Sequence, residues 1–167
     1  MGVGVLPLLL SLVFPACGKM GAQGVTPPGL VDFNHLVLPK SPNKALAAPA
    51  GFKPTPDLIT PRYHVAPAAL FAIVGQVAAN EARVFSLDHY PADLQAAWVA
   101  RTPTANFPDV IELAVRPDPA GGSDLILYSH SIYGQSDFGV NAARVKKWLG
   151  AIEAKVVASA TSSGTRS

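Results

Sequence analysis

The chain has 167 residues, of which 49% are apolar and 14% are charged, and its formal net charge is +2. This composition fits one globular domain with tails and argues against disorder throughout, and the small net charge argues against a nucleic-acid partner. Cys17 is the single cysteine, which excludes an internal disulfide bond and a thiolate metal cluster.

The N-terminus has the pattern of an export signal. The apolar run over residues 2–16 is too short to span a bilayer as a mature helix, but it has the length of a signal-peptide core. Cys17 follows Ala16 and precedes Gly18, an arrangement that resembles a bacterial lipoprotein signal, in which the cysteine becomes the lipidated first residue. We therefore expect a signal peptide over residues 1–17 and an exported, periplasmic protein, anchored to the membrane if Cys17 is lipidated. An ordinary signal peptide and a misassigned start codon are the alternatives.

Residues 19–61 contain eight prolines, spaced too closely for a helix. Apolar residues such as Phe33 and Phe52 make the stretch too hydrophobic for a plain solvated tether. We therefore expect residues 18–29 to form a flexible linker and residues 30–52 to lie extended against the domain.

Beyond residue 61 the apolar periodicity predicts strands and helices. The predicted strands cover residues 63–65, 84–87, 94–102, 110–116 and 125–133, and the predicted helices cover residues 67–81 and 141–157. In the fourth strand Ile111, Leu113 and Val115 alternate with Glu112, Ala114 and Arg116. Pro67 suits a first helical turn, Asn141 suits an N-cap, and Trp148 lies on the apolar stripe of the last helix. Residues 158–167 are rich in Ser, Thr and Gly and are expected to be a disordered tail.

These elements predict an α+β fold: a two-layer domain over residues 30–157, with an antiparallel sheet of about four to five strands and two helices on one face. The last strand is apolar on both sides, with Leu125 and Leu127 on one and Ile126 and Tyr128 on the other. Such a strand is central and covered twice. The extended Pro-rich segment is therefore expected to pack against the face without helices.

Most of the polar residues whose side chains could take part in binding or catalysis lie around the junction between the last strand and the last helix. Together with blocks nearer the N-terminus, they resemble the bacterial family of domain of unknown function 1499, especially its exported alphaproteobacterial members. The resemblance covers most of residues 31–149, and the matching residues are Asp32-Phe33, Ser41-Pro42-Asn43, Ala45-Leu46, Pro49-Ala-Gly51, Arg101-Thr102, Phe107-Pro108-Asp109, Ser129, Ser131, Tyr133, Gly134, Ser136, Asp137, Gly139, Asn141, Arg144, Trp148 and Leu149. The resemblance implies no particular activity. Members usually carry arginine where this chain has His130 and Ile132, so the chain lacks the charges on which an anion site would depend there.

The serines of this region invite comparison with the nucleophile elbow Gly-x-Ser-x-Gly. The motif around Ser136 has one residue too many before its second glycine, and it follows an antiparallel strand. Ser129 and Ser131 share one strand face while His130 points to the other, so we expect no catalytic dyad there. No catalytic residue is assigned, and a small hydrolase that uses a serine of this motif stays the alternative.

Four ionic residues beside apolar strands are expected to form buried or half-buried pairs, Arg101 or Arg144 with Asp109 or Asp137. A polar binding pocket is the alternative interpretation. The candidate binding residues are Arg101, Asp109, Ser129, Ser131, Tyr133, Ser136, Asp137, Asn141 and Arg144. The histidines show no metal-ligand spacing, so no metal and no cofactor is assigned.

Three functions stay open. The first is an exported non-enzymatic domain, with or without a lipid anchor, that binds a small ligand or an envelope protein. The second is the serine hydrolase. The third is contact with anionic lipid through the last helix, whose basic residues are Arg144, Lys146, Lys147 and Lys155. A deep pocket with converging polar groups would indicate an enzyme, and an exposed apolar groove would indicate a binding module.

Overall fold

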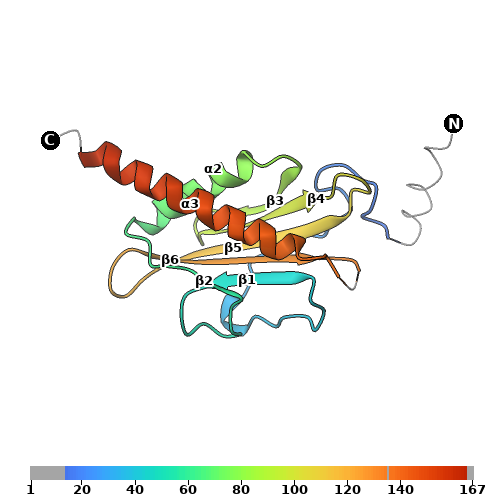
Figure 1. The fold of residues 1–167 in the computed structure, drawn as a ribbon, viewed down its shortest axis with the longest axis horizontal. Coiled ribbons are helices and arrows are strands. Elements are labelled where there is room, and N and C mark those ends of the chain that lie inside the picture. The colour runs from blue at the N-terminus through green and yellow to red at the C-terminus, as the bar shows by residue number, and fades with distance from the viewer. Residues whose placement is uncertain (1–13, 135, 165–167) are drawn as a thin grey trace.

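The computed structural model describes residues 14–134 and 136–164, which form one sheet with two helices on the same side (Figure 1). The elements in chain order are the 3-10 helix η1 (Phe33–His35), β1 (Lys44–Ala48), β2 (Leu58–Ile59), α2 (Pro67–Ala79), β3 (Val84–Tyr90), β4 (Gln95–Arg101), β5 (Pro108–Pro117), β6 (Ser123–Ser131) and α3 (Val140–Gly164).

The sheet has six strands in the order β2-β1-β6-β5-β4-β3. Neighbouring strands are antiparallel except β1 and β2, which pair in parallel. The α+β class with two helices is confirmed, but the sheet is mixed and has more strands than predicted. The additional strands come from the Pro-rich stretch, where Lys44–Ala48 has no β-branched residue to indicate a strand. Of the strand predicted at residues 63–65, Tyr63 alone forms a β-bridge, with Ser123.

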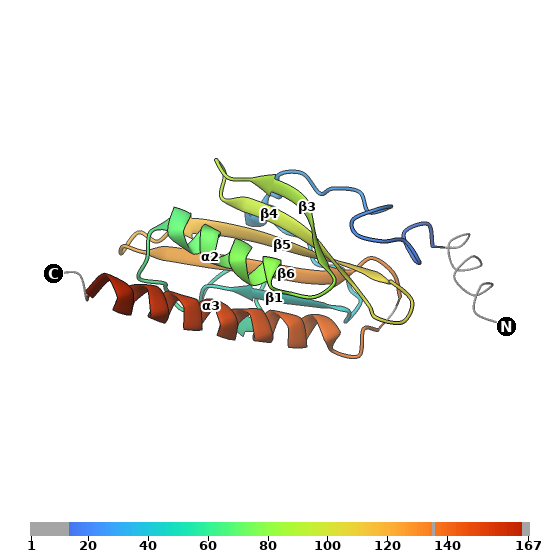
Figure 2. The same ribbon diagram turned by 90° about the horizontal axis from the view of Figure 1, so that it is seen from above.

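The larger core lies between the sheet and the helices α2 and α3, which cross the same side of the sheet (Figure 2). Trp98 of β4 and Trp148 of α3 meet edge to face, with ring centroids 5.6 Å apart, and Trp148 is fully buried. Leu125 and Leu127 of β6 belong to the same core. The apolar stripe predicted for the last helix therefore faces the sheet, as expected.

The opposite side of the sheet carries a second core, formed with the Pro-rich N-terminal segment. Phe33 of η1 is buried with Ile126 and Tyr128 of β6. The apolar residues of the segment that pack around this cluster are Val31, Leu36, Leu38 and Phe52. Because β6 is apolar on both sides, it needs this second cover, and the prediction that residues 30–52 lie against the sheet is confirmed.

Residues 14–25 also lie against the sheet, in contrast to the flexible linker predicted for residues 18–29. They contribute to a small third core, which contains Ala16, Val25, Val99 and Val110. Cys17 is fully buried in this arrangement, and burial raises the pKa of its thiol. The segment is rich in glycine and has no apolar periodicity, so its position depends on contacts with distant strands rather than on a local pattern.

The C-terminal end of the described chain is helical, and the N-terminal end includes only the last part of the predicted signal peptide. Helix α3 continues to Gly164, beyond the end predicted at residue 157, and thus includes most of the predicted disordered tail. Most of the predicted signal peptide, residues 1–13, lies outside the described residues. Within the described ranges, no helix combines the length and the hydropathy that a membrane span requires.

Candidate functional site

Asp137 caps the first turn of α3. Its carboxylate accepts hydrogen bonds from the backbone N–H of Gly139 at 3.0 Å and of Asn141 at 2.8 Å. Burial raises the pKa of Asp137, but these bonds and one from the Asn141 side-chain amide outweigh burial and lower the pKa below its ordinary value. The N-cap predicted at Asn141 is therefore wrong, because Asn141 is already inside the helix and the carboxylate of Asp137 satisfies its N–H.

Asn141 and Arg144 of α3 instead reach two serines of β6. The Ser129 hydroxyl donates to Asn141 Oδ1 at 2.6 Å and accepts from Arg144 Nη1 at 3.0 Å. Asn141 Nδ2 donates to Ser131 Oγ at 3.0 Å. Arg144 Nη2 also forms a salt bridge of 2.7 Å with Asp109 of β5. One of the predicted buried pairs is thus present, and the network ties α3 to the two central strands.

This network occupies the hydroxyl groups that a hydrolase would need. Ser129 is fully buried, and the hydroxyl groups of Ser129 and Ser131 are both bonded to α3. His130 projects from the other side of β6, where its ring stacks on Tyr128 with centroids 4.8 Å apart. Ser136 is exposed, its hydroxyl accepts a bond from the N–H of Phe138 at 3.3 Å, and no described contact brings a histidine to it. The geometry therefore offers no serine–histidine dyad among the described residues.

Arg101 and Tyr133 hold the N-terminal segment. Arg101 is 4% exposed, and its guanidinium donates to four backbone carbonyl groups, those of Ala16, Gly21, Gln23 and Asn106. The hydroxyl of Tyr133 accepts a bond from the Ala16 N–H at 3.2 Å. The predicted pairing of Arg101 with an acid is wrong, because carbonyl groups take its donors.

Three of the four basic residues of α3 are engaged within the chain. Arg144 belongs to the network with Asp109, and Lys147 Nζ pairs with Glu81 at 2.7 Å. Lys155 Nζ donates to the side chain of Gln76 at 3.4 Å. This helix therefore offers an anionic membrane fewer uncommitted cations than its sequence suggests.

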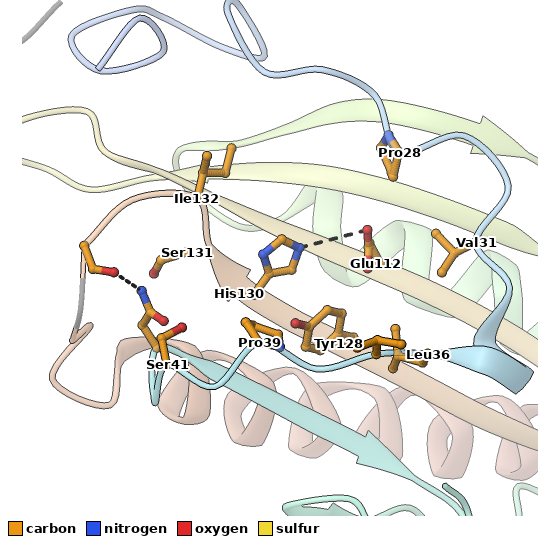
Figure 3. Close-up of a pocket in the computed structure, with 13 residues that line it drawn as sticks. Pro28, Val31, Leu36, Pro39, Ser41, Glu112, Tyr128, His130, Ser131 and Ile132 are labelled. Carbon is orange, nitrogen blue, oxygen red and sulfur yellow. Dashed lines mark hydrogen bonds and ion pairs between the residues drawn. The ribbon is translucent and has the colours of Figure 1, made fainter. Parts of the chain in front are cut away.

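A pocket of about 640 Å³ opens on the side of the sheet without helices (Figure 3). Strands β5 and β6 contribute Glu112, Tyr128, His130 and Ser131, and Ile132 follows β6. The N-terminal segment contributes the opposing residues Pro28, Val31, Leu36, Val37, Pro39, Ser41 and Asn43. In Figure 3 Glu112 and His130 point toward one another, with the N-terminal segment passing around them.

Glu112 was not among the residues predicted from the sequence. It is 8% exposed, and its Oε1 lies 4.0 Å from His130 Nε2, which is longer than a hydrogen bond. No described residue donates a hydrogen bond to its carboxyl group. The strand alternation placed Glu112 on the polar side of β5, but the expected cover of that side by residues 30–52 was a signal that this side chain would be buried.

Burial changes the ionisation of both groups in the pocket. It raises the pKa of Glu112 to about 7. Burial also lowers the pKa of His130, although a hydrogen bond with the backbone of Ser131 and the charge of Asp109 act in the opposite direction. At neutral pH the pocket therefore contains a neutral imidazole beside a carboxyl group that is about half ionised.

A second pocket of about 320 Å³ meets the first at the Glu112–His130 pair. Both pockets are also lined by Pro28 and Ile132, and the second is completed by Gly24, Val25, Thr26, Val110 and Tyr133. No lysine or arginine lines either pocket. Elsewhere in the described part of the chain, no three His, Cys, Asp or Glu residues are grouped so that they could hold a metal ion.

Comparison with known proteins assigns a family and no activity. No curated protein matches the chain. The model of the family described as "Protein of unknown function (DUF1499)" matches residues 37–152, which is more than half of the chain. The match contains both the network at the start of α3 and the Glu112–His130 pair. In agreement with the resemblance noted in the sequence, the chain belongs to the DUF1499 family of proteins of unknown function.

Proposed function

We propose that this chain is an exported envelope protein whose domain binds a small molecule, without catalysing a reaction, in the pocket of Glu112 and His130. The observation that carries the binding role is the carboxyl group of Glu112, which is buried beside the pocket and receives no hydrogen bond from a described residue. Buried polar groups in folded proteins nearly always have a partner. The Glu112 oxygens are not fully enclosed, so they are accessible from the pocket, and a ligand there would provide that partner.

The size and lining of the pocket support binding. Its volume of about 640 Å³ falls within the range of roughly 300–1,000 Å³ that is typical of ligand sites, and apolar residues surround a few polar groups. A covalent mechanism would need a nucleophile. The hydroxyl of Ser131, which lines this pocket, is bonded to Asn141 on the helix side of the sheet. This arrangement favours a binding role over nucleophilic catalysis.

Export and a lipid anchor are supported by the apolar run over residues 2–16 and by the position of Cys17. Processing before Cys17 would remove Ala16, whose backbone bonds to Tyr133 and Arg101. The buried Cys17 would also have to leave the sheet before it could carry a lipid. The docked and the lipidated forms of this segment are therefore alternatives.

Metabolic labelling with an alkyne fatty acid tests the anchor. We expect labelled wild-type protein in the membrane fraction and no label on Cys17→Ser. Equal labelling of the two proteins would rule out Cys17 as the lipid site. Unlabelled wild type in the soluble periplasmic fraction would indicate export without an anchor, and unlabelled protein in the cytoplasm would contradict export itself.

Native mass spectrometry of the purified protein, after incubation with a small-molecule extract, tests the binding role. We expect the wild type to retain a compound and Ile132→Trp to lose it, because the indole fills space in both pockets. Val157→Trp is the matched control, since Val157 is 64% exposed on α3 and lines neither pocket. Equal retention by the wild type and Ile132→Trp, or no retention by the wild type, would contradict the proposed function.

A further inference from the structure

On the basis of the proposed function, we infer that the ligand of this pocket is an organic cation: an ammonium group on an apolar body, with the Glu112 carboxylate as its counter-ion. The inference deepens the binding role, because it names the class of molecule that the same pocket accepts. Three features carry it: the uncompensated carboxyl group, the lack of basic side chains in the lining, and the aromatic rings beside Glu112.

Among the described residues, no lysine or arginine forms an ion pair with the carboxyl group of Glu112. Its cross-strand neighbours are Ala97 on β4 and Tyr128 on β6, and neither carries a positive charge. His130 lies 4.0 Å away, but burial lowers its pKa and keeps it neutral at pH 7. A buried carboxylate without a partner is costly, and a cation that enters the pocket offsets this cost.

The rest of the lining suits a cation with an apolar body. No lysine or arginine among the described residues lines the pocket, and the ammonium group of Lys44 donates to the carbonyl of Ser41, so an anionic ligand would meet the Glu112 carboxylate with no basic side chain of the lining against it. Val31, Leu36 and Pro39 supply apolar surface. The rings of Tyr128 and His130 are stacked beside Glu112 (Figure 3), and aromatic rings attract cations within about 6 Å of their centroids.

Binding of a cation here should depend on pH. Burial raises the pKa of Glu112 to about 7 in the free protein, and a cation favours the ionised form, so binding below pH 7 releases a proton. Affinity should then fall by about tenfold for each pH unit below 7. The other titratable groups beside Glu112 are Tyr128 and His130 of β6. Next to these lie Lys44 of β1, which is opposite His130 and donates to the carbonyl of Ser41, and Asp57, whose charge acts on Tyr128. On β4 the neighbour is Ala97, and the N-terminal segment lines the pocket with uncharged residues. Protonated His130 would repel a cation and would act in the same direction.

Isothermal titration calorimetry with three probes that share a hexyl chain tests the inference. The probes are hexyltrimethylammonium, hexanol and hexanoate, each measured against the purified wild-type protein at pH 6 and pH 8. We expect the ammonium to bind more tightly than the other two, and about tenfold more tightly at pH 8 than at pH 6. Equal affinity for the ammonium at the two pH values would contradict the role of Glu112.

Two variants locate the effect. Glu112→Gln should lose about tenfold or more in affinity for the ammonium at pH 8. Its remaining affinity should differ between pH 6 and pH 8 by less than the tenfold expected for the wild type. Glu153→Gln removes an exposed carboxylate on α3 and should bind as the wild type does. If Glu112→Gln does not fold, an equal wild-type affinity for the ammonium at pH 6 and pH 8 still overturns the inference.

The outcomes separate this inference from the proposed function. Hexanol or hexanoate binding as tightly as the ammonium would overturn the cation and leave the binding pocket in place. If none of the three probes binds, the compound retained in native mass spectrometry decides. A cationic compound would support the inference, and a neutral or anionic one would overturn it. A pocket that retains nothing would overturn both proposals.

Discussion

Glu112 of β5 and His130 of β6 face each other on the side of the sheet without helices, with 4.0 Å between Oε1 and Nε2. Both side chains are largely buried, yet neither forms a hydrogen bond with the other at this distance. Burial therefore opposes ionisation of each side chain, and no hydrogen bond between them offsets it. The pH dependence of folding should report this effect, because a pKa that changes on folding makes stability depend on pH.

We predict that ionisation of Glu112 destabilises the fold as the pH rises. Its pKa is about 7 in the folded protein against an ordinary value of 4.5. Its contribution to stability is therefore fully present below pH 4.5 and is lost as the pH rises through 7. The pKa of His130 is lowered on folding, so its contribution is present above its ordinary value of 6.5 and is lost as the pH falls.

Urea unfolding of the wild type and Glu112→Gln at pH 5 and pH 8 separates the two groups, because the glutamine variant keeps His130. Relative to Glu112→Gln, the wild type should lose about 2–3 kcal/mol of unfolding free energy between pH 5 and pH 8. If both proteins respond equally to pH, Glu112 does not titrate in this range.

Replacement of Arg144 should destabilise the protein strongly. Arg144→Ala leaves Asp109 buried and unpaired and also removes the donor to Ser129. We expect a loss of about 3–5 kcal/mol in urea unfolding. Lys147→Ala is the control, because it breaks a more exposed pair with Glu81 and should cost less than about 1 kcal/mol. Similar losses in the two variants would mean that the network contributes no more than a surface pair.

Trp148 should contribute through packing. Trp148→Ala removes a fully buried ring that contacts Trp98, and large-to-small changes of this kind cost about 3–5 kcal/mol. Val157→Ala, at an exposed position of the same helix, should leave the unfolding free energy nearly unchanged. A melting temperature of Trp148→Ala within a degree or so of the wild type would contradict the core position.

Arg101 should control the docking of residues 14–25. Arg101→Ala removes donors to four carbonyl groups, each worth about 0.5–1.5 kcal/mol, so tryptic cleavage at the exposed Lys19 should accelerate about tenfold or more. Cleavage at Lys40 serves as the internal control and should keep its wild-type rate. Unchanged cleavage at Lys19 would mean that Arg101 does not hold the segment, and equal acceleration at both sites would mean that the whole domain has opened.

Local apolar periodicity was sufficient to predict the elements whose own side chains form the core. The stripe of Trp148 predicted the buried face of α3, and the two apolar sides of β6 predicted a second cover. Lys44–Ala48 was expected to lie against the sheet but was not predicted as one of its strands, and residues 14–25 were not predicted to pack at all. Their sequences are rich in alanine or glycine, and contacts with distant strands determine where they lie.

The sequence indicated several residues of the candidate site but not the contacts that each of them makes. Asp109 and Arg144 pair as expected, and the candidate residue Ser129 bonds to the same arginine. The choice of Asp137 as the cap depends on the path of the preceding loop, which local sequence does not determine. The burial of Glu112 was not predicted, because the alternation in β5 indicates a polar side that faces solvent. In the structure, the N-terminal segment covers that side.

A carbon-13 NMR titration of the glutamate carboxyl groups, with the Glu112 signal assigned from Glu112→Gln, tests the central claim most directly. We predict that this signal titrates at about 7 in the free protein and that hexyltrimethylammonium moves its titration to lower pH. A Glu112 signal that titrates near 4.5, both with and without the ammonium, would contradict a buried, unpaired carboxyl group at a ligand site.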